Sequence, residues 1–103
     1  MIALVEQNLE AIRALCEEFG VLRLELFGSA ATGAFDLERS DLDFLVEYPP
    51  NYDFGPWLTR YFAFRDELAA LLGRSVDLVM VGALRKPRFI RSVNESRQLL
   101  YAA

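Results

Sequence analysis

The stretch LFGSAATGAFDLERSDLDFLV (residues 26–46) joins two apolar runs through a turn of small residues. Gly28 and Ser29 close the first run, and Asp41 and Asp43 lead into the second. Aspartate is depleted in β-strands, and like charges held side by side repel each other. A pair of carboxylates at the start of a strand therefore needs a compensating partner, unless it simply lies in water.

A divalent cation is a partner that fits this pair. Residues i and i+2 of a strand point to the same face, so Asp41 and Asp43 would lie about 7 Å apart and could converge on one ion. Hard oxygen ligands favour Mg²⁺ or Mn²⁺. Asp77, in the apolar segment SVDLV, becomes a third ligand if its strand is a neighbour and it faces the same side. Three carboxylates suit a two-metal site for phosphoryl transfer.

Gly28 and Ser29 could form the other half of such a site. A glycine after a strand lets a phosphate approach the backbone, and free N–H groups at a following helix start attract anions. Taken alone, each signal is weak, since a Gly-Ser pair is an ordinary turn and strand aspartates are often solvated. Their order along one chain is what favours a joint phosphate and metal site.

Composition limits the other options. The chain has 103 residues, of which 53% are hydrophobic and 25% charged, which predicts one globular domain over residues 1–103. Cys16 is the only cysteine and there is no histidine, so an internal disulfide and histidine-based catalysis are excluded, and a zinc site is not expected. Cys16 falls on an apolar helix stripe, which predicts core packing. No signal peptide or membrane span is expected, and this predicts a cytoplasmic protein.

The charge is unevenly distributed. Through residue 84 there are six arginines against fourteen acidic residues, whereas from Arg85 onward Glu95 is the only acid. We name residues 85–97 the basic tail. The acidic body argues against direct nucleic-acid binding. The basic tail could contact phosphates or an acidic partner, or could be a solvated helix face, and both interpretations stay open.

The apolar pattern predicts a small mixed α/β (α+β) sheet with helices packed mainly on one face. Aromatic residues of the second long helix, among them Trp57, Tyr61 and Phe64, are expected in the core. The predicted helices are 3–19, ended by Gly20, then 56–73 and a short one at 86–93; the predicted strands are 21–27, 41–47 and 75–81, with 97–102 a last strand or a helical end.

The pattern FGS…G…SDLDFLV…VDLV resembles the nucleotidyltransferase fold of the DNA polymerase β type, specifically the minimal nucleotidyltransferase (MNT) proteins. These are antitoxins paired with HEPN-domain toxins, and the likeness covers nearly the whole chain. The resemblance implies that Gly28 and Ser29 hold the nucleoside triphosphate. It also implies that Asp41 and Asp43 bind two Mg²⁺ ions, and that Asp77 completes the metal site and helps to deprotonate the acceptor hydroxyl.

The reaction implied by the resemblance is transfer of AMP from ATP to a hydroxyl with release of pyrophosphate. The acceptor would be a tyrosine of a HEPN toxin, so we expect a hetero-oligomer, with a homodimer as a further option. The alternative is a binding module that neutralises its partner by covering it, and Thr32 in place of an arginine and the basic tail favour it. The chain departs from the family pattern in two places. Ala30 and Thr32 stand where the family often has an aromatic residue or arginine, and the turn before Asp41 is one residue longer than usual. Arg39 could replace the missing cation. A third function, transfer to a small hydroxylated substrate or to an RNA end, is the least favoured of the three.

Overall fold

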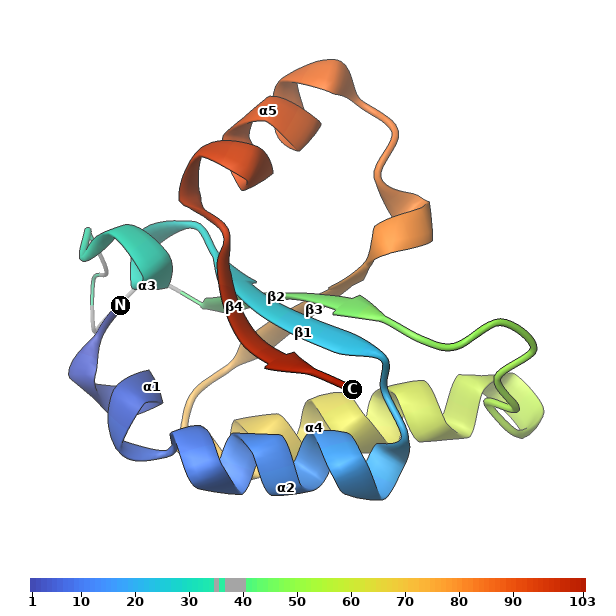
Figure 1. Cartoon of the computed structure of the whole chain (residues 1–103). Coiled ribbons are helices and arrows are strands. Elements are labelled where there is room, and N and C mark those ends of the chain that lie inside the picture. The colour runs from blue at the N-terminus through green and yellow to red at the C-terminus, as the bar shows by residue number, and fades with distance from the viewer. Residues whose placement is uncertain (35, 37–40) are drawn as a thin grey trace.

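A mixed β-sheet lies at the centre of the fold (Figure 1). The computed structural model describes residues 1–34, 36 and 41–103, and within these the sheet has four strands in the order β3-β2-β1-β4. β1 is antiparallel to β2 and β4, and β2 is parallel to β3. The last segment is thus a strand, the first of the two predicted options. The strands are β1 (Arg23–Phe27), β2 (Leu42–Glu47), β3 (Val76–Met80) and β4 (Gln98–Ala102).

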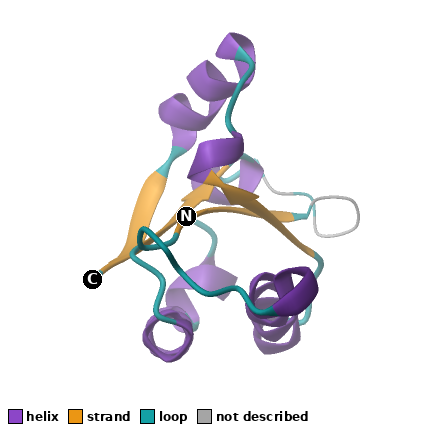
Figure 2. Cartoon of the chain, turned by 90° about the vertical axis from the view of Figure 1, so that its right-hand side faces the viewer, coloured by secondary structure: helices purple, strands orange, loops and turns teal. Residues whose placement is uncertain are grey.

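The helices lie mainly on one face of the sheet, as predicted. α1 (Ala3–Gln7), α2 (Leu9–Phe19) and α4 (Thr59–Leu72) cover this face, and α5 (Pro87–Ser96) stands over the other, which we name the α5 face (Figures 1 and 2). α4 links β2 to β3, which gives two parallel strands the helical crossover that they need. No described helix combines the length and the apolar character needed to cross a membrane.

Two clusters of buried side chains follow from the alternation of the strands. The larger packs Leu26 and Phe44 of the sheet against Ile12 and Phe64 of the helices. Cys16 is fully buried in the same cluster, which confirms its predicted core role, and burial raises the pKa of its thiol to about 12. The smaller cluster lies on the α5 face and consists of Phe27, Leu45 and Val93.

The predicted helix over residues 3–19 is wrong in one respect, because it is two helices that meet at Asn8. The backbone of Asn8 has φ −111° and ψ 12°, and its side-chain amide donates a hydrogen bond of 2.8 Å to the carbonyl of Leu4. Asparagine competes in this way for backbone partners that would otherwise continue a helix. Gly20 ends α2 in the left-handed region, at φ 68°, as predicted.

The predicted helix over residues 56–73 begins later than expected. A 3-10 turn, η1 (Pro56–Leu58), precedes α4, and Trp57 and Leu58 have φ values of 59° and 57°. Trp57 is 93% exposed, so its predicted place in the core is wrong. Helical spacing could not predict the direction of the Trp57 side chain, because the backbone of this residue is left-handed rather than helical. Phe64 is buried and Tyr61 half-buried, which confirms the core role for those two.

Each outer strand has one carbonyl bound by a helix side chain. Arg13 of α2 donates from Nε to the Leu100 carbonyl of β4 at 2.9 Å, and the hydroxyl of Tyr61 in α4 donates to the Leu78 carbonyl of β3. The β1–β4 register also shifts between Leu24 and Glu25, as at a β-bulge. Side-chain caps and bulges of this kind make an edge strand a poorer template for another strand.

Candidate active site

Asp43 and Asp77 lie side by side on the α5 face of the sheet. They are register partners in the parallel pair β2–β3, and paired residues on neighbouring strands have backbones about 4.8 Å apart. Their chain neighbours Phe44 and Leu78 are buried in the larger cluster on the opposite face. Both conditions for Asp77 are therefore met, because its strand is a neighbour of β2 and it faces the same side as Asp43.

Asp41 lies just before β2 and is exposed, whereas Asp43 is half-buried. Desolvation is the main cause that raises the pKa of Asp43 to about 6, and the charges of Asp77 and Asp41 raise it further. The ion pairs formed within residues 1–34, 36 and 41–103 do not include any of the three carboxylates. The charge on Asp43 is thus uncompensated by protein groups in this region.

The side chains of Asp41, Asp43 and Asp77 do not have the arrangement of a metal ligand set in this structure. No group of three or more histidine, cysteine, aspartate or glutamate side chains among the described residues has the arrangement of a metal site. They are electrostatically coupled neighbours rather than a closed cage. A cation still suits them, because it would remove the repulsion that raises the pKa of Asp43 and because carboxylate oxygens are the ligands that Mg²⁺ and Mn²⁺ prefer.

Gly28 brings the end of β1 against the Asp43 carboxylate. Its φ of 74° and ψ of −152° favour glycine, and a Cβ at this position would lie 2.6 Å from Oδ2 of Asp43. Phe27, the preceding residue, is the register partner of Asp43 in β2. Ser29 then begins the short helix α3 (Ser29–Thr32), which lies in the stretch predicted as a turn. The structure thus brings Gly28, Ser29, Asp43 and Asp77 to one region of the α5 face.

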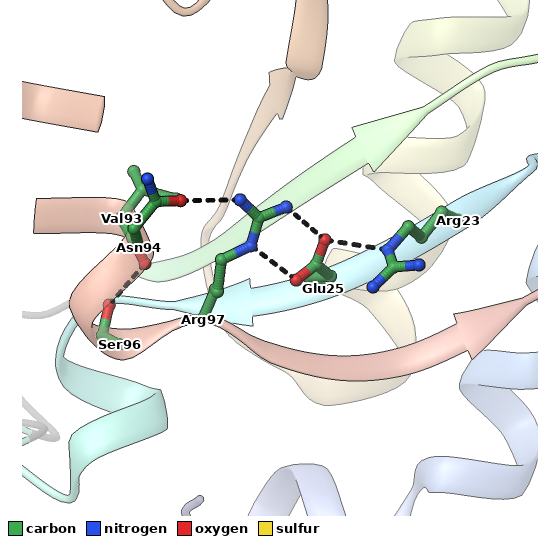
Figure 3. Close-up of polar contacts among 6 residues, drawn as sticks. All are labelled: Arg23, Glu25, Val93, Asn94, Ser96 and Arg97. Carbon is green, nitrogen blue, oxygen red and sulfur yellow. Dashed lines mark hydrogen bonds and ion pairs between the residues drawn. The ribbon is translucent and has the colours of Figure 1, made fainter. Parts of the chain in front are cut away.

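A polar network ties the end of α5 to this region (Figure 3). The Gly28 N–H donates to Oγ of Ser96 at 2.9 Å. Next to it, Arg97 binds Glu25 of β1 with two hydrogen bonds, from Nη2 to Oε1 at 2.6 Å and from Nε to Oε2 at 2.8 Å. Arg23 also donates from Nε to Oε1, at 3.0 Å.

Glu25 is a buried charge that sequence reasoning missed. It is 4% exposed, and its pKa is lowered mainly by the hydrogen bond from Arg97. The missed signal is a carboxylate inside the apolar run of β1, which requires a cationic partner. Arg97 of the basic tail supplies it, so this arginine serves the fold and is not free to bind phosphate.

The positions that depart from the family pattern carry no cation. Ala30 is buried, and the Thr32 hydroxyl donates to the Ser29 carbonyl at 3.4 Å. Arg39, predicted as a replacement, lies outside the described residues, as does most of the turn over residues 33–40. In the basic tail, Arg85 is folded back onto the carbonyls of Gly82 and Leu84.

A cavity of about 580 Å³ lies away from the carboxylates. Its walls include Tyr48, Phe54, Met80 and Arg85, so it sits at the ends of β2 and β3 that follow Val46 and Met80. Asp43 and Asp77 are near the beginnings of the same strands. The grouped carboxylates and the close glycine favour the other end of the sheet for the candidate chemistry.

Comparison with known proteins gives a matching family and several similar relatives. The family described as "Nucleotidyltransferase domain" matches residues 9–100. A Methanocaldococcus jannaschii protein assigned as a protein adenylyltransferase is 36% identical over 83 residues, which is 81% of this chain and 80% of that protein. The protein adenylyltransferase MntA of Thermococcus cleftensis is 38% identical over 73 residues, or 71% and 69% of the two chains.

Solved structures give the same fold. A structure described as a minimal nucleotidyltransferase superposes with a TM-score of 0.74 at 31% identity, covering 94% of this chain and 95% of that one. A more distant match, at 20% identity and a TM-score of 0.65, covers 95% and 72% of the two chains. It is a tri-AMPylated HEPN toxin from Shewanella oneidensis in complex with an MNT antitoxin, and at this identity it supports the fold alone.

Proposed function

The chain belongs to the nucleotidyltransferase domain family, and from this premise we propose that it transfers AMP from ATP to a hydroxyl group in a Mg²⁺-dependent reaction. The acceptor we propose is a tyrosine of a HEPN-domain toxin, whose activity the transfer would block. The observation that carries the proposal is the pairing of Asp43 with Asp77 next to the close backbone of Gly28.

In this proposal Asp41, Asp43 and Asp77 hold the divalent cations, and Gly28 and Ser29 hold the triphosphate. The bound cations would neutralise phosphate charge and lower the barrier for attack. The acceptor oxygen forms a bond to the α-phosphorus, and the bond to the pyrophosphate oxygen breaks. The Asp77 carboxylate accepts the hydroxyl proton, and pyrophosphate leaves with the electron pair of the broken bond.

We further propose that residues 1–103 act as one domain, in the cytoplasm, and in a complex with the toxin. The relatives named above support this unit size, because this chain spans 69% to 95% of their own lengths. Asp41 and Asp77 are exposed, so the acceptor can approach these carboxylates. A homodimer is a second possible form of the chain. Measurement of the molecular mass in solution would reveal it.

The test is transfer of labelled nucleotide to a HEPN-domain protein encoded beside this chain. With ATP labelled at the α-phosphate and Mg²⁺ present, we expect label on the toxin and release of pyrophosphate. ATP labelled at the γ-phosphate should leave the toxin unlabelled. Absence of transfer with both Mg²⁺ and Mn²⁺ would contradict the proposal.

A second candidate is a binding module that masks the toxin without modifying it. It is favoured by the uncharged side chains at Ala30 and Thr32 and by the lack of a formed ligand set among the described residues. An Asp41→Ala/Asp43→Ala double variant separates the two candidates in cells that express the toxin. Loss of protection supports the transferase, whereas full protection supports masking.

A further inference from the structure

The hydrogen bond between Gly28 and Ser96 joins two segments that are 68 residues apart in sequence. Gly28 directly follows β1, and Ser96 is the last residue of α5. Oγ of Ser96 accepts the Gly28 N–H at 2.9 Å, and its own proton can go to the carbonyl of Ser92 at 3.3 Å or Val93 at 3.4 Å. The hydroxyl is therefore a bridge from the α5 backbone to the turn. Figure 3 draws the contact of Ser96 with Val93.

The position of this bridge is fixed by the residues beside it. Arg97 follows Ser96 directly and binds Glu25 of β1 through two hydrogen bonds, while its Nη1 donates to Oδ1 of Asn94 at 2.7 Å. Val93 is buried against the α5 face of the sheet. The C-terminal turn of α5 is thus attached to β1 by an ion pair and an apolar contact, so Ser96 presents a rigid acceptor to Gly28.

The amide that Ser96 holds belongs to the glycine in closest approach to Asp43. The φ of 74° and ψ of −152° at Gly28 leave the peptide little support from its own conformation, because glycine has many alternatives of similar energy. If the N–H lost its acceptor, the peptide plane before Gly28 could rotate toward water. Such a rotation would alter the separation between the Gly28–Ser29 turn and the Asp43 carboxylate, which now pack in contact.

We propose that Ser96 is a positioning residue for nucleotide capture: by accepting the Gly28 N–H, it fixes the Gly28–Ser29 turn relative to Asp43. The inference rests on the proposed function, in which this turn and this carboxylate bind the same triphosphate. Ser96 itself does not touch the nucleotide. Its effect is on how well the two halves of the site are aligned before ATP arrives.

Kinetics of AMP transfer by the full chain, with the HEPN partner, ATP and Mg²⁺, test the proposal. Ser96→Ala removes the acceptor and should raise KM for ATP about tenfold, with kcat within about twofold, since loss of one hydrogen bond to a partly buried amide weakens ground-state and transition-state binding together. Ser96→Thr keeps the hydroxyl and should restore KM. An unchanged kcat/KM in Ser96→Ala, or a failure of Ser96→Thr to restore it, would overturn the proposal.

Ser92→Ala is the matched control, because Ser92 lies one turn earlier on α5 and is exposed. Its KM should equal that of the wild-type chain. A purely structural role for Ser96 predicts the reverse pattern, with a lowered melting temperature and an unchanged KM, and would overturn the proposal.

Amide hydrogen exchange at Gly28 gives a second readout that does not depend on activity. Exchange should be about tenfold faster in Ser96→Ala than in Ser92→Ala or Ser96→Thr, because the donated bond protects the amide. Equal exchange in all variants would overturn the inference. If the wild-type chain transfers no AMP, the proposed function fails, and the Gly28 amide still reports whether Ser96 holds the turn.

Discussion

Asp43 and Asp77 occupy paired positions on the parallel strands β2 and β3 and share the α5 face of the sheet. The pairing places two negative charges where protein groups described by the structure supply no opposite charge. The repulsion between these charges lowers the free energy of unfolding of the metal-free protein. The effect can be measured from stability, from its pH dependence and from its response to cations.

Asp43→Asn should stabilise the metal-free protein at pH 7 while abolishing AMP transfer. The expected gain in the free energy of unfolding is about 1 kcal/mol, because solvent screening around a half-buried carboxylate reduces the electrostatic cost. Transfer should fall at least about a hundredfold. Urea unfolding and label transfer measure the two effects. Asp66→Asn, on an exposed residue of α4, should change neither by a comparable amount.

The same carboxylate predicts the sign of a pH dependence. The pKa of Asp43 is raised to about 6 from its ordinary value of 3.8, mainly by desolvation, so the folded state binds this proton more tightly than the unfolded state. Stability from this group is therefore highest below about pH 4 and falls as the pH rises to about 6. The difference in stability between wild type and Asp43→Asn should grow over this interval and be constant above it. A difference that is the same at pH 4 and pH 7 would contradict this account.

Mg²⁺ should stabilise the wild-type chain more than Asp43→Asn. A ligand that binds only the folded state adds about 2.7 kcal/mol at a concentration a hundredfold above its dissociation constant. Thermal unfolding with and without Mg²⁺ measures this shift, and EDTA should reverse it. Equal shifts in the two proteins would mean that the cation binds elsewhere.

Gly28→Ala should destabilise the protein by about 2–3 kcal/mol, because the new Cβ would lie 2.6 Å from Oδ2 of Asp43 on a backbone with φ 74°. AMP transfer should be lost as well. Gly82→Ala is the matched control, since a Cβ at Gly82 meets no atom within 4 Å. Chemical denaturation of both variants gives the comparison, and similar losses in the two would refute the role of close approach.

Arg97→Met should destabilise the protein by about 2 kcal/mol at pH 7, because Glu25 is left buried with Arg23 as its remaining partner. The pKa of Glu25 is lowered in the folded state, so this stabilisation is present above its unfolded pKa and is lost as the pH falls. The effect of Arg97→Met should therefore shrink in acid. Arg65→Met, which breaks an exposed pair with Asp66, should cost less than about 0.5 kcal/mol.

The face on which Asp43 lies was predictable, because strand alternation has a period of two and needs only local sequence. Its pairing with Asp77 was predicted only on the condition that the two strands are neighbours. The α/β class, the Gly28 turn and the membership of the nucleotidyltransferase family followed from the same short motifs, and the comparisons confirm the family. The roles of Asp41, Asp43, Asp77, Gly28 and Ser29 in binding and catalysis stay predictions.

Contacts between distant segments could not be predicted in this way. Nothing near Ser96 in sequence indicates that its hydroxyl meets Gly28, because the contact exists only after β4 has paired with β1. The predicted core position of Trp57 was wrong for a different reason. Its helical spacing extends the apolar stripe of α4, but the left-handed backbone at residues 57 and 58 turns the side chain into solvent.

The side-chain caps on the outer strands bear on how this protein can assemble. Arg13 occupies the Leu100 carbonyl at one edge of the sheet, and Tyr61 occupies the Leu78 carbonyl at the other. A second chain cannot lengthen the sheet at these points without first displacing a helix side chain. Each contact therefore disfavours the pairing of a further strand at that point of the edge.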